Sequence, residues 1–206
     1  QTQQQLSVVL NAIREAQSLY ILGADPPEIY KLMLKTLVEV TQSQYGFLDE
    51  IVFENGIIGK KNLAISDISW DEKSKALYKK LQDREMKFTY LENLSGLPAL
   101  TGKTIISNDP SHDLRSKGVP QGHPSIHSFM GMPLYFGGKL ICVAGVANRQ
   151  NGYNAGIADF IEPLLTTCAS ITYALQKDRL EKENERKIVE SESKYRTLAE
   201  NFPNGA

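Results

Sequence analysis

The sequence predicts an α+β fold, in which a central antiparallel β-sheet carries helices on its faces. Two pairs of turn residues predict the sheet, because Asn55-Gly56 and Gly137-Gly138 each separate two apolar segments, as in tight β-hairpins. A third observation predicts the helices: towards both ends of the chain, apolar residues recur every three or four positions. Strands joined by hairpins pair in antiparallel fashion, and the flanking helices then pack on the sheet.

The composition is that of a globular protein. A chain of 206 residues with 41% hydrophobic and 23% charged residues suits one domain with flanking helices. The net charge of −1 indicates neither nucleic acid nor an anionic membrane as the main partner. No apolar run reaches the roughly 18 residues that span a bilayer, and the N-terminus lacks the layout of a signal peptide. We therefore expect a cytoplasmic protein, without membrane insertion within this chain, in which Cys142 and Cys168 are reduced.

Two helices are expected before the first strand. Residues 2–22 carry one apolar stripe, and residues 23–27 then break the chain. A second helix begins near Pro26, which suits the first turn of a helix.

The strands follow the second helix. Residues 45–53 are rich in aromatic and β-branched residues, and their hairpin partner is residues 57–69. A helix is expected at residues 71–84, and short strands are expected at 87–91 and 104–109.

A long loop and a second hairpin complete the sheet. Residues 108–127 are dense in turn-forming residues, and a loop of this length in a compact domain is usually functional. The hairpin then pairs residues 128–136 with residues 139–148. The last helix begins near Ala155 and runs past Lys187, where almost every residue is charged, so it leaves the globular body for solvent or a partner helix.

The long loop and the second hairpin resemble a GAF domain, a small-molecule sensing fold of signalling proteins. The resemblance covers about residues 26–176, and it includes the early segments 45–47 and 68–70. Its most specific part is a G-x-P-x-G-H-P segment, an F-x-G-x-P-L strand and a second strand that ends in A-N-R, with Asn151 in place of the first glycine of a final G-G-Y. The matching residues are Gly118, Pro120, Gly122, His123, Pro124, Phe129, Gly131, Pro133, Leu134, Ala147, Asn148, Arg149, Gly152 and Tyr153.

The end of the chain resembles the start of a PAS domain. The segment Y-R-T-L-A-E-N, followed by Pro203 and Gly205, is similar to the helix that opens that fold. The resemblance implies four parts: a connector helix at 1–25, the GAF domain at 26–176, a charged linker helix at 177–192 and a truncated PAS domain at 193–206. It also implies a parent sensor that ends in a histidine kinase, with a diguanylate cyclase as the alternative. This chain contains no G-x-S-x-G, P-loop or CxxC motif, so we expect no enzymatic activity within it.

We expect the first strand, the second strand and the end of the long loop to line a ligand pocket. The candidate ligand-binding residues are Phe47, Ile65, His123, His127, Phe129 and Cys142. The cofactor is not determined: a haem held by a histidine, or another cofactor held by Cys142, remains an alternative. A covalent bilin is not expected, because the Cys-His pair of phytochrome-like GAF domains is replaced by Ile126-His127, and the cyclic-nucleotide signature is incomplete. No metal site or catalytic residue is expected.

The terminal helices predict a homodimer. Residues 2–22 precede the sheet and residues 160–188 run out of the body, so each needs a partner for its apolar side. The alternative function is therefore a ligand-free dimerising spacer between other domains of the same chain.

Overall fold

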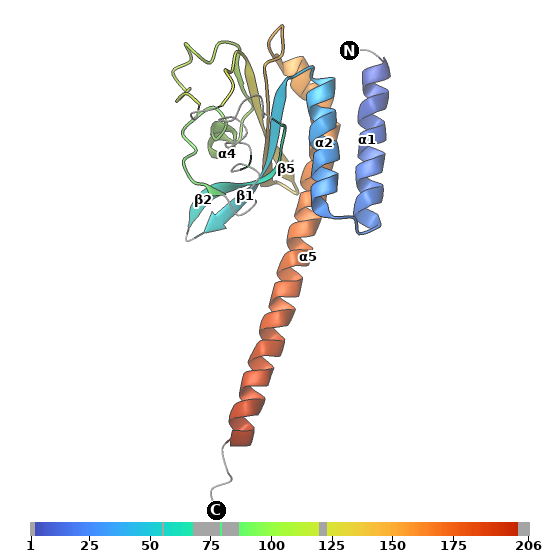
Figure 1. Cartoon of the computed structure of the whole chain (residues 1–206), viewed down its shortest axis with the longest axis vertical. Helices are drawn as coiled ribbons and strands as arrows, with labels where there is room; N and C mark the ends of the chain where they lie inside the picture. Colours follow the sequence, from blue (N-terminus) through green and yellow to red (C-terminus); the bar gives the residue numbers. More distant parts are fainter. Residues whose placement is uncertain (1–2, 55, 68–78, 80–86, 120–122, 202–206) are drawn as a thin grey trace, which may run out of the picture.

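The computed structural model describes residues 3–54, 56–67, 79, 87–119 and 123–201, with side chains to residue 197. A sheet carries a layer of helices on one face and a short helix with long loops on the other, and one helix extends far beyond this body (Figure 1). The elements are α1 (Gln3–Ile21), α2 (Pro26–Val40), β1 (Tyr45–Glu54), β2 (Ile57–Ile65), β3 (Lys87–Phe88), α4 (Leu97–Thr101), β4 (Ile105–Ser107), β5 (Phe129–Phe136), β6 (Lys139–Ala147) and α5 (Ala155–Asn201).

The sheet has six strands in the order β3-β2-β1-β6-β5-β4, and every neighbouring pair is antiparallel. Both predicted hairpins are present, with Glu54 opposite Ile57 in the first and Phe136 opposite Lys139 in the second. The last strand of the second hairpin pairs with the first strand of the first, so β1 and β6 lie at the centre. The predicted α+β class is therefore confirmed.

Two helices, α2 and α5, cover one face of the sheet, and α1 packs on the outside of these two (Figure 1). Alternate residues of each strand point to this face, where they meet the apolar stripes of the helices. The resulting core is one continuous cluster that includes Val9, Ala16, Ile29, Met33, Leu37, Leu48, Met130, Met132, Cys142, Ala144, Ile161, Leu164 and Cys168. We call this side the helix face.

The other side, which we call the cavity face, is covered by α4 and the segments around it (Figure 1). Its apolar residues form two smaller clusters, one around Phe129 and Leu94 and one around Ile51 and Val143. The helix α4 was not predicted, because five residues are too few to show a helical period. It ends at Gly102, whose φ of 65° is the left-handed conformation typical of a residue that follows a helix.

Most predicted elements are confirmed, with shorter strands than expected. β2 ends at Ile65, β3 contains only residues 87–88, and β4 contains only residues 105–107. The helix predicted at 71–84 falls almost wholly outside the described residues.

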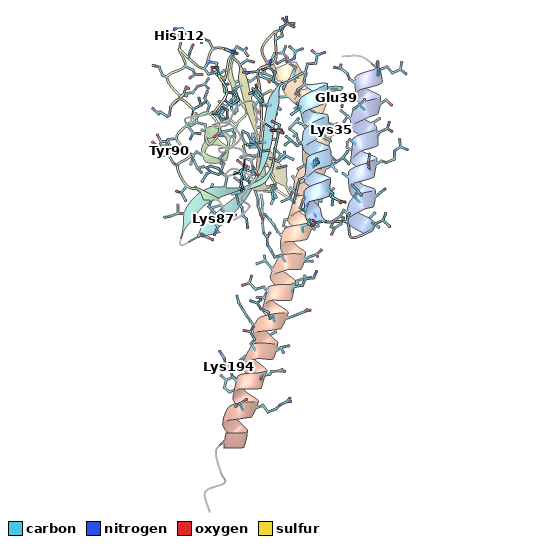
Figure 2. The ribbon with its side chains drawn as sticks, in the orientation of Figure 1. Lys35, Glu39, Lys87, Tyr90, His112 and Lys194 are labelled. Atoms are coloured by element: carbon cyan, nitrogen blue, oxygen red, sulfur yellow. The ribbon has the colours of Figure 1, made fainter. Side chains whose placement is uncertain are left out.

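The helix α5 continues without interruption through the predicted linker, as expected from its charged composition. Residues 177–197 are exposed, and Figure 2 shows Lys194 on the projecting part of the helix. Lys187 Nζ lies 2.8 Å from Glu183 Oε1, one of the i,i+4 pairs that stabilise an exposed helix. Within the part of the chain that is described, no helix has the length and apolarity needed to cross a bilayer.

The apolar side of α1 is largely buried within a single chain, although its position before the sheet suggested that it would need a partner chain. Val9, Ala12 and Ala16 are buried, because α1 packs on α2 and α5. Leu6 and Leu10 on the same helix are about half exposed, at 48% and 50%.

Candidate ligand-binding site

A cavity of about 260 Å³ lies on the cavity face of the sheet. Its floor comes from the central strands: Tyr45 and Phe47 of β1, Gly145 and Ala147 of β6, and Phe129 of β5. One wall is the turn at 93–95, and residues 116–119 with His123 lie over the opening. The cavity therefore forms where the central strands meet the long loop.

Glycine makes room for the aromatic floor. A Cβ on Gly145 would lie 2.2 Å from Cε1 of Phe47, so the Phe47 ring lies directly on the backbone of β6. A Cβ on Gly131 would similarly lie 2.9 Å from Cε1 of Phe129. The F-x-G pattern of the sequence is thus a packing requirement, because the ring and the glycine occupy the same space on the sheet.

A buried polar cluster borders the cavity. Lys60 Nζ lies 2.8 Å from Asp49 Oδ2, and Asn62 Nδ2 donates to Asp49 Oδ1 at 3.1 Å. The side chains of Lys60 and Asp49 are 6% and 4% exposed. The Lys60 ammonium also lies 4.5 Å from the centroid of the Phe47 ring and donates to Ser95 Oγ at 3.2 Å. Since Phe47 and Ser95 line the cavity, this ion pair supports its wall from behind.

The cluster was not predicted from the sequence. Asp49 and Asn62 are opposite each other in the β1–β2 pairing, and Lys60 is opposite Ile51 two positions along the same face. The sequence did carry a signal for this cluster: three polar residues lie on one face of a predicted hairpin, where cross-strand and diagonal neighbours interact.

The loop over the cavity is anchored at both ends. At its start, Asn108 Nδ2 donates to the carbonyl of Tyr153 at 3.0 Å, and the Tyr153 N–H donates to Asn108 Oδ1 at 2.8 Å. Arg115 Nη2 donates to the carbonyl of Ile106 at 2.9 Å and pairs with Asp113, and this guanidinium holds the pKa of Asp113 well below its usual range. The loop extends to the edge of the molecule farthest from α1, where Figure 2 labels His112.

Asn148 anchors the other end of the loop. Its φ of 63° is left-handed, a conformation that asparagine tolerates better than most residues. Its Oδ1 accepts from the His127 N–H at 2.7 Å, and its Nδ2 donates to the carbonyl of Ser125 at 2.9 Å and to Gln44 Oε1 at 3.2 Å. The asparagine of the A-N-R pattern therefore ties the end of the loop to the start of β1.

Four of the six predicted site residues line the cavity: Phe47, Ile65, His123 and Phe129. His123 Nδ1 lies 2.8 Å from the carbonyl oxygen of Pro124, which leaves Nε2 for another partner. Whether these residues bind a ligand stays a prediction. The lining also includes Tyr45, Phe88, Ser95 and Lys117, which sequence analysis did not select.

The other two predicted residues lie elsewhere. His127 is exposed and does not line the cavity, because its backbone is held by Asn148 while its side chain faces solvent. Cys142 is fully buried in the core of the helix face, next to Ala144 along β6. Residues 142 and 144 share a face, as expected, but that face is the opposite one. Burial raises the pKa of the Cys142 thiol, and a bond from Cys142 to a cofactor in the cavity is excluded by this position.

The dimensions of the cavity limit the cofactors that fit. A dry cavity of about 150 Å³ holds one benzene molecule, so about 260 Å³ suits one ring or two fused rings. Among the residues that the structure describes, no group of three His, Cys, Asp or Glu side chains is placed to hold a metal ion.

On the helix face, β1 contacts the helix that leaves the body. Glu50 is 2% exposed, and its Oε1 accepts from Gln176 Nε2 at 2.8 Å and from Arg179 Nη2 at 2.6 Å. Glu50 lies three residues after Phe47 on the same strand but on the helix face. One strand therefore contacts both the cavity and α5.

An antiparallel sheet with helices on one face and a loop-covered cavity on the other defines a small sensing domain of signalling proteins. The family model for the GAF domain matches residues 23–172, so the chain belongs to the GAF family.

Solved structures agree on the fold. The GAF domain of the phosphoenolpyruvate-protein phosphotransferase from Acinetobacter superposes with a TM-score of 0.66 at 15% identity, covering 86% of this chain and 97% of that one. The GAF domain of the corresponding enzyme from Coxiella burnetii has a TM-score of 0.64 at 17% identity, covering 86% and 98%.

One curated relative is a sensor. The methyl sulfide methyltransferase-associated sensor of Methanosarcina acetivorans is 26% identical over 135 residues, which are 64% of this chain. The matched part spans 13% of the length of that sensor.

Proposed function

We propose that this chain is the cytoplasmic input module of a multidomain signalling protein, in which a small molecule binds the cavity and thereby changes the position of α5. The observation that carries the proposal is the double role of β1. Phe47 forms the floor of the cavity, and Glu50, roughly 10 Å along the same strand, binds α5 from the other face. A shift of β1 on ligand binding therefore reaches the helix that leads out of the domain.

The contact lies where α5 leaves the body. Gln176 is partly buried, and the Arg179 side chain is already 60% exposed. Because the Glu50 carboxylate is buried, its hydrogen bonds to α5 are costly to leave unmade.

We further propose that α5 leads to a PAS domain and that the parent protein is a histidine kinase, with a diguanylate cyclase as the alternative output. The similarity of the last residues to the start of a PAS domain supports the first part, and the sensor from Methanosarcina supports a signalling parent. On this proposal any transferase activity belongs to the parent, outside these residues. The two cysteines are free and buried, which suits a reducing compartment.

A homodimer through α1 and α5 is part of the proposal. Apolar side chains remain exposed on both helices, and a parallel partner would bury them. They are Leu6 and Leu10 on α1 and Leu180, Ile188 and Val189 on α5. The same residues favour the second candidate function, a ligand-free dimerising spacer.

The test measures binding and relay on the same chain. A chemically broad set of small molecules is screened by thermal shift, and the hits are titrated into protein with spin labels at Lys103→Cys and Glu185→Cys. We expect a hit to change the distance between the labels. We expect Glu50→Gln to reduce that change while binding persists, and Glu181→Gln, which loses only an exposed pair with Lys177, to leave it intact.

The spacer function makes the opposite prediction. No compound of any class would raise the melting temperature, and light scattering would still find a dimer. That combination would overturn the sensor proposal.

A further inference from the structure

We infer that the cavity takes a small aromatic carboxylate, a molecule with one ring or two fused rings and one acidic group. This inference rests on the proposed function and deepens it, because it names the chemical class of the ligand. It follows from the size of the cavity, the aromatic residues that line it and the charges around its opening.

The lining is rich in aromatic rings. Tyr45, Phe47, Phe88 and Phe129 all line the cavity. Phe47 packs against Gly145, where a Cβ would lie 2.2 Å from its Cε1, so its aromatic ring forms part of the floor. Aromatic surfaces of this kind favour a planar ring over an aliphatic group of equal volume.

The charge of the lining favours an anion. Among the described residues that line the cavity there is no Asp or Glu, whereas Lys117 and His123 are present. Lys117 makes no ion pair with the residues that the structure describes. The buried Lys60 contributes no net charge here, because Asp49 lies 2.8 Å from its ammonium group.

Acidic residues of the covering loop are already engaged. Asp109 bonds to Ser111 and His112, and Asp113 bonds to Arg115. Neither carboxylate lines the cavity. A cationic ligand therefore finds no carboxylate among the described lining residues, whereas a carboxylate finds the Lys117 ammonium, a strong donor to an anion.

The aromatic rings and the positive charge occupy opposite ends of the cavity. The aromatic floor belongs to the buried strands, whereas Lys117 and Val119 lie on the exposed loop and His123 is half-buried. A bound molecule would place its ring on Phe47 and Phe129 and its carboxylate at the opening. A free inorganic anion lacks the ring that fills the floor.

The experiment titrates the whole chain with probes of matched size. Benzoate and indole-3-carboxylate carry both features, benzamide lacks the charge, benzamidine reverses it, and cyclohexanecarboxylate lacks the aromatic ring. Calorimetry and amide chemical shifts around Ala147 and Ser95 report binding in the cavity. We expect the two aromatic carboxylates to bind, benzamide and cyclohexanecarboxylate to bind roughly tenfold more weakly, and benzamidine not to bind.

Two variants test whether Lys117 is the residue that binds the carboxylate of the ligand. Lys117→Gln is an exposed loop substitution, so we expect it to fold normally and to lower the affinity for benzoate roughly tenfold without changing that for benzamide. Lys103→Gln, which removes an exposed lysine outside the lining, is the control and leaves both affinities unchanged.

The outcomes separate the inference from the proposed function. Binding of benzamidine as tight as that of benzoate, an unchanged benzoate affinity in Lys117→Gln, or a hit of another class with no aromatic carboxylate binding would overturn the inference alone. The proposed function would fail as well only if no compound of any class bound.

Discussion

The two faces of the central sheet use the same strands for different purposes. On the helix face, apolar side chains of β1, β5 and β6 pack against α2 and α5, and α1 completes one continuous core. On the cavity face, the neighbouring residues of the same strands form two small apolar clusters, a buried ion pair and a cavity. β1 illustrates the contrast, because Leu48 and Glu50 point to the helices while Phe47 and Asp49 point to the other side.

The difference follows from what covers each face. Regular helices present periodic apolar stripes, which interdigitate with the sheet over most of the helix face. A loop carries backbone N–H and C=O groups that need partners, so the cavity face depends on polar anchors such as Asn108 and Asn148. The helix face holds the continuous core, with a cleft of about 300 Å³ at its edge between α2, β2 and α5, whereas the cavity face holds the polar anchors and the cavity under the loop.

The largest expected effect tests whether the cavity face depends on its ion pair. Lys60→Met leaves the Asp49 carboxylate buried without its cation, so we expect the free energy of unfolding to fall by about 3–5 kcal/mol in urea denaturation. The double variant Asp49→Leu with Lys60→Met recovers much of that loss, because neither charge is then buried alone. A loss below about 1 kcal/mol for Lys60→Met would mean that the pair is not essential to this face.

The next effect tests the apolar packing of the helix face. Leu164 on α5 is 1% exposed, and we expect Leu164→Ala to cost about 2–5 kcal/mol, because it removes buried methyl groups and leaves a cavity. Leu180→Ala on the same helix is the control, since Leu180 is 58% exposed and should change stability by less than about 0.5 kcal/mol. Equal melting temperatures for the two variants would contradict the contrast.

A chemical probe distinguishes the faces at Cys142. Burial raises the pKa of this thiol, and that of Cys168 to about 12, so both remain protonated and unreactive near neutral pH. We expect no labelling by a maleimide in the native protein and two labels per chain in guanidinium chloride. Rapid native labelling of Cys142 would place it on the cavity face or at an opening.

The smallest effect separates two histidines. His127 is exposed and outside the lining, so we expect His127→Ala to change stability by less than about 0.5 kcal/mol and to leave binding of benzoate unchanged. His123→Gln is the comparison, because His123 lines the cavity and its substitution should weaken that binding. Loss of binding in His127→Ala would restore the role that sequence analysis gave to this residue.

The sequence by itself determined most of the elements and the two antiparallel hairpins. These signals are local: helical periods lie within one segment, and a two-residue turn specifies both a hairpin and its register. Gly137 and Gly138 have φ values of 56° and 75°, which glycine adopts without strain, so the second hairpin could be read from its turn. The cavity residues Phe47 and Phe129 could be selected because their strands were recognised and the long loop followed.

Only the tertiary structure decided which face of each strand meets the helices. Alternation placed Cys142 and Ala144 together, but nothing in the local sequence says which of two apolar faces is covered by helices and which by a loop. The polar partnerships are equally non-local, since Asn148 reaches Gln44, and Glu50 meets Arg179 at a separation of 129 residues. Such contacts depend on the complete packing of the chain, because they join side chains that come together only after the sheet and the long helix have docked.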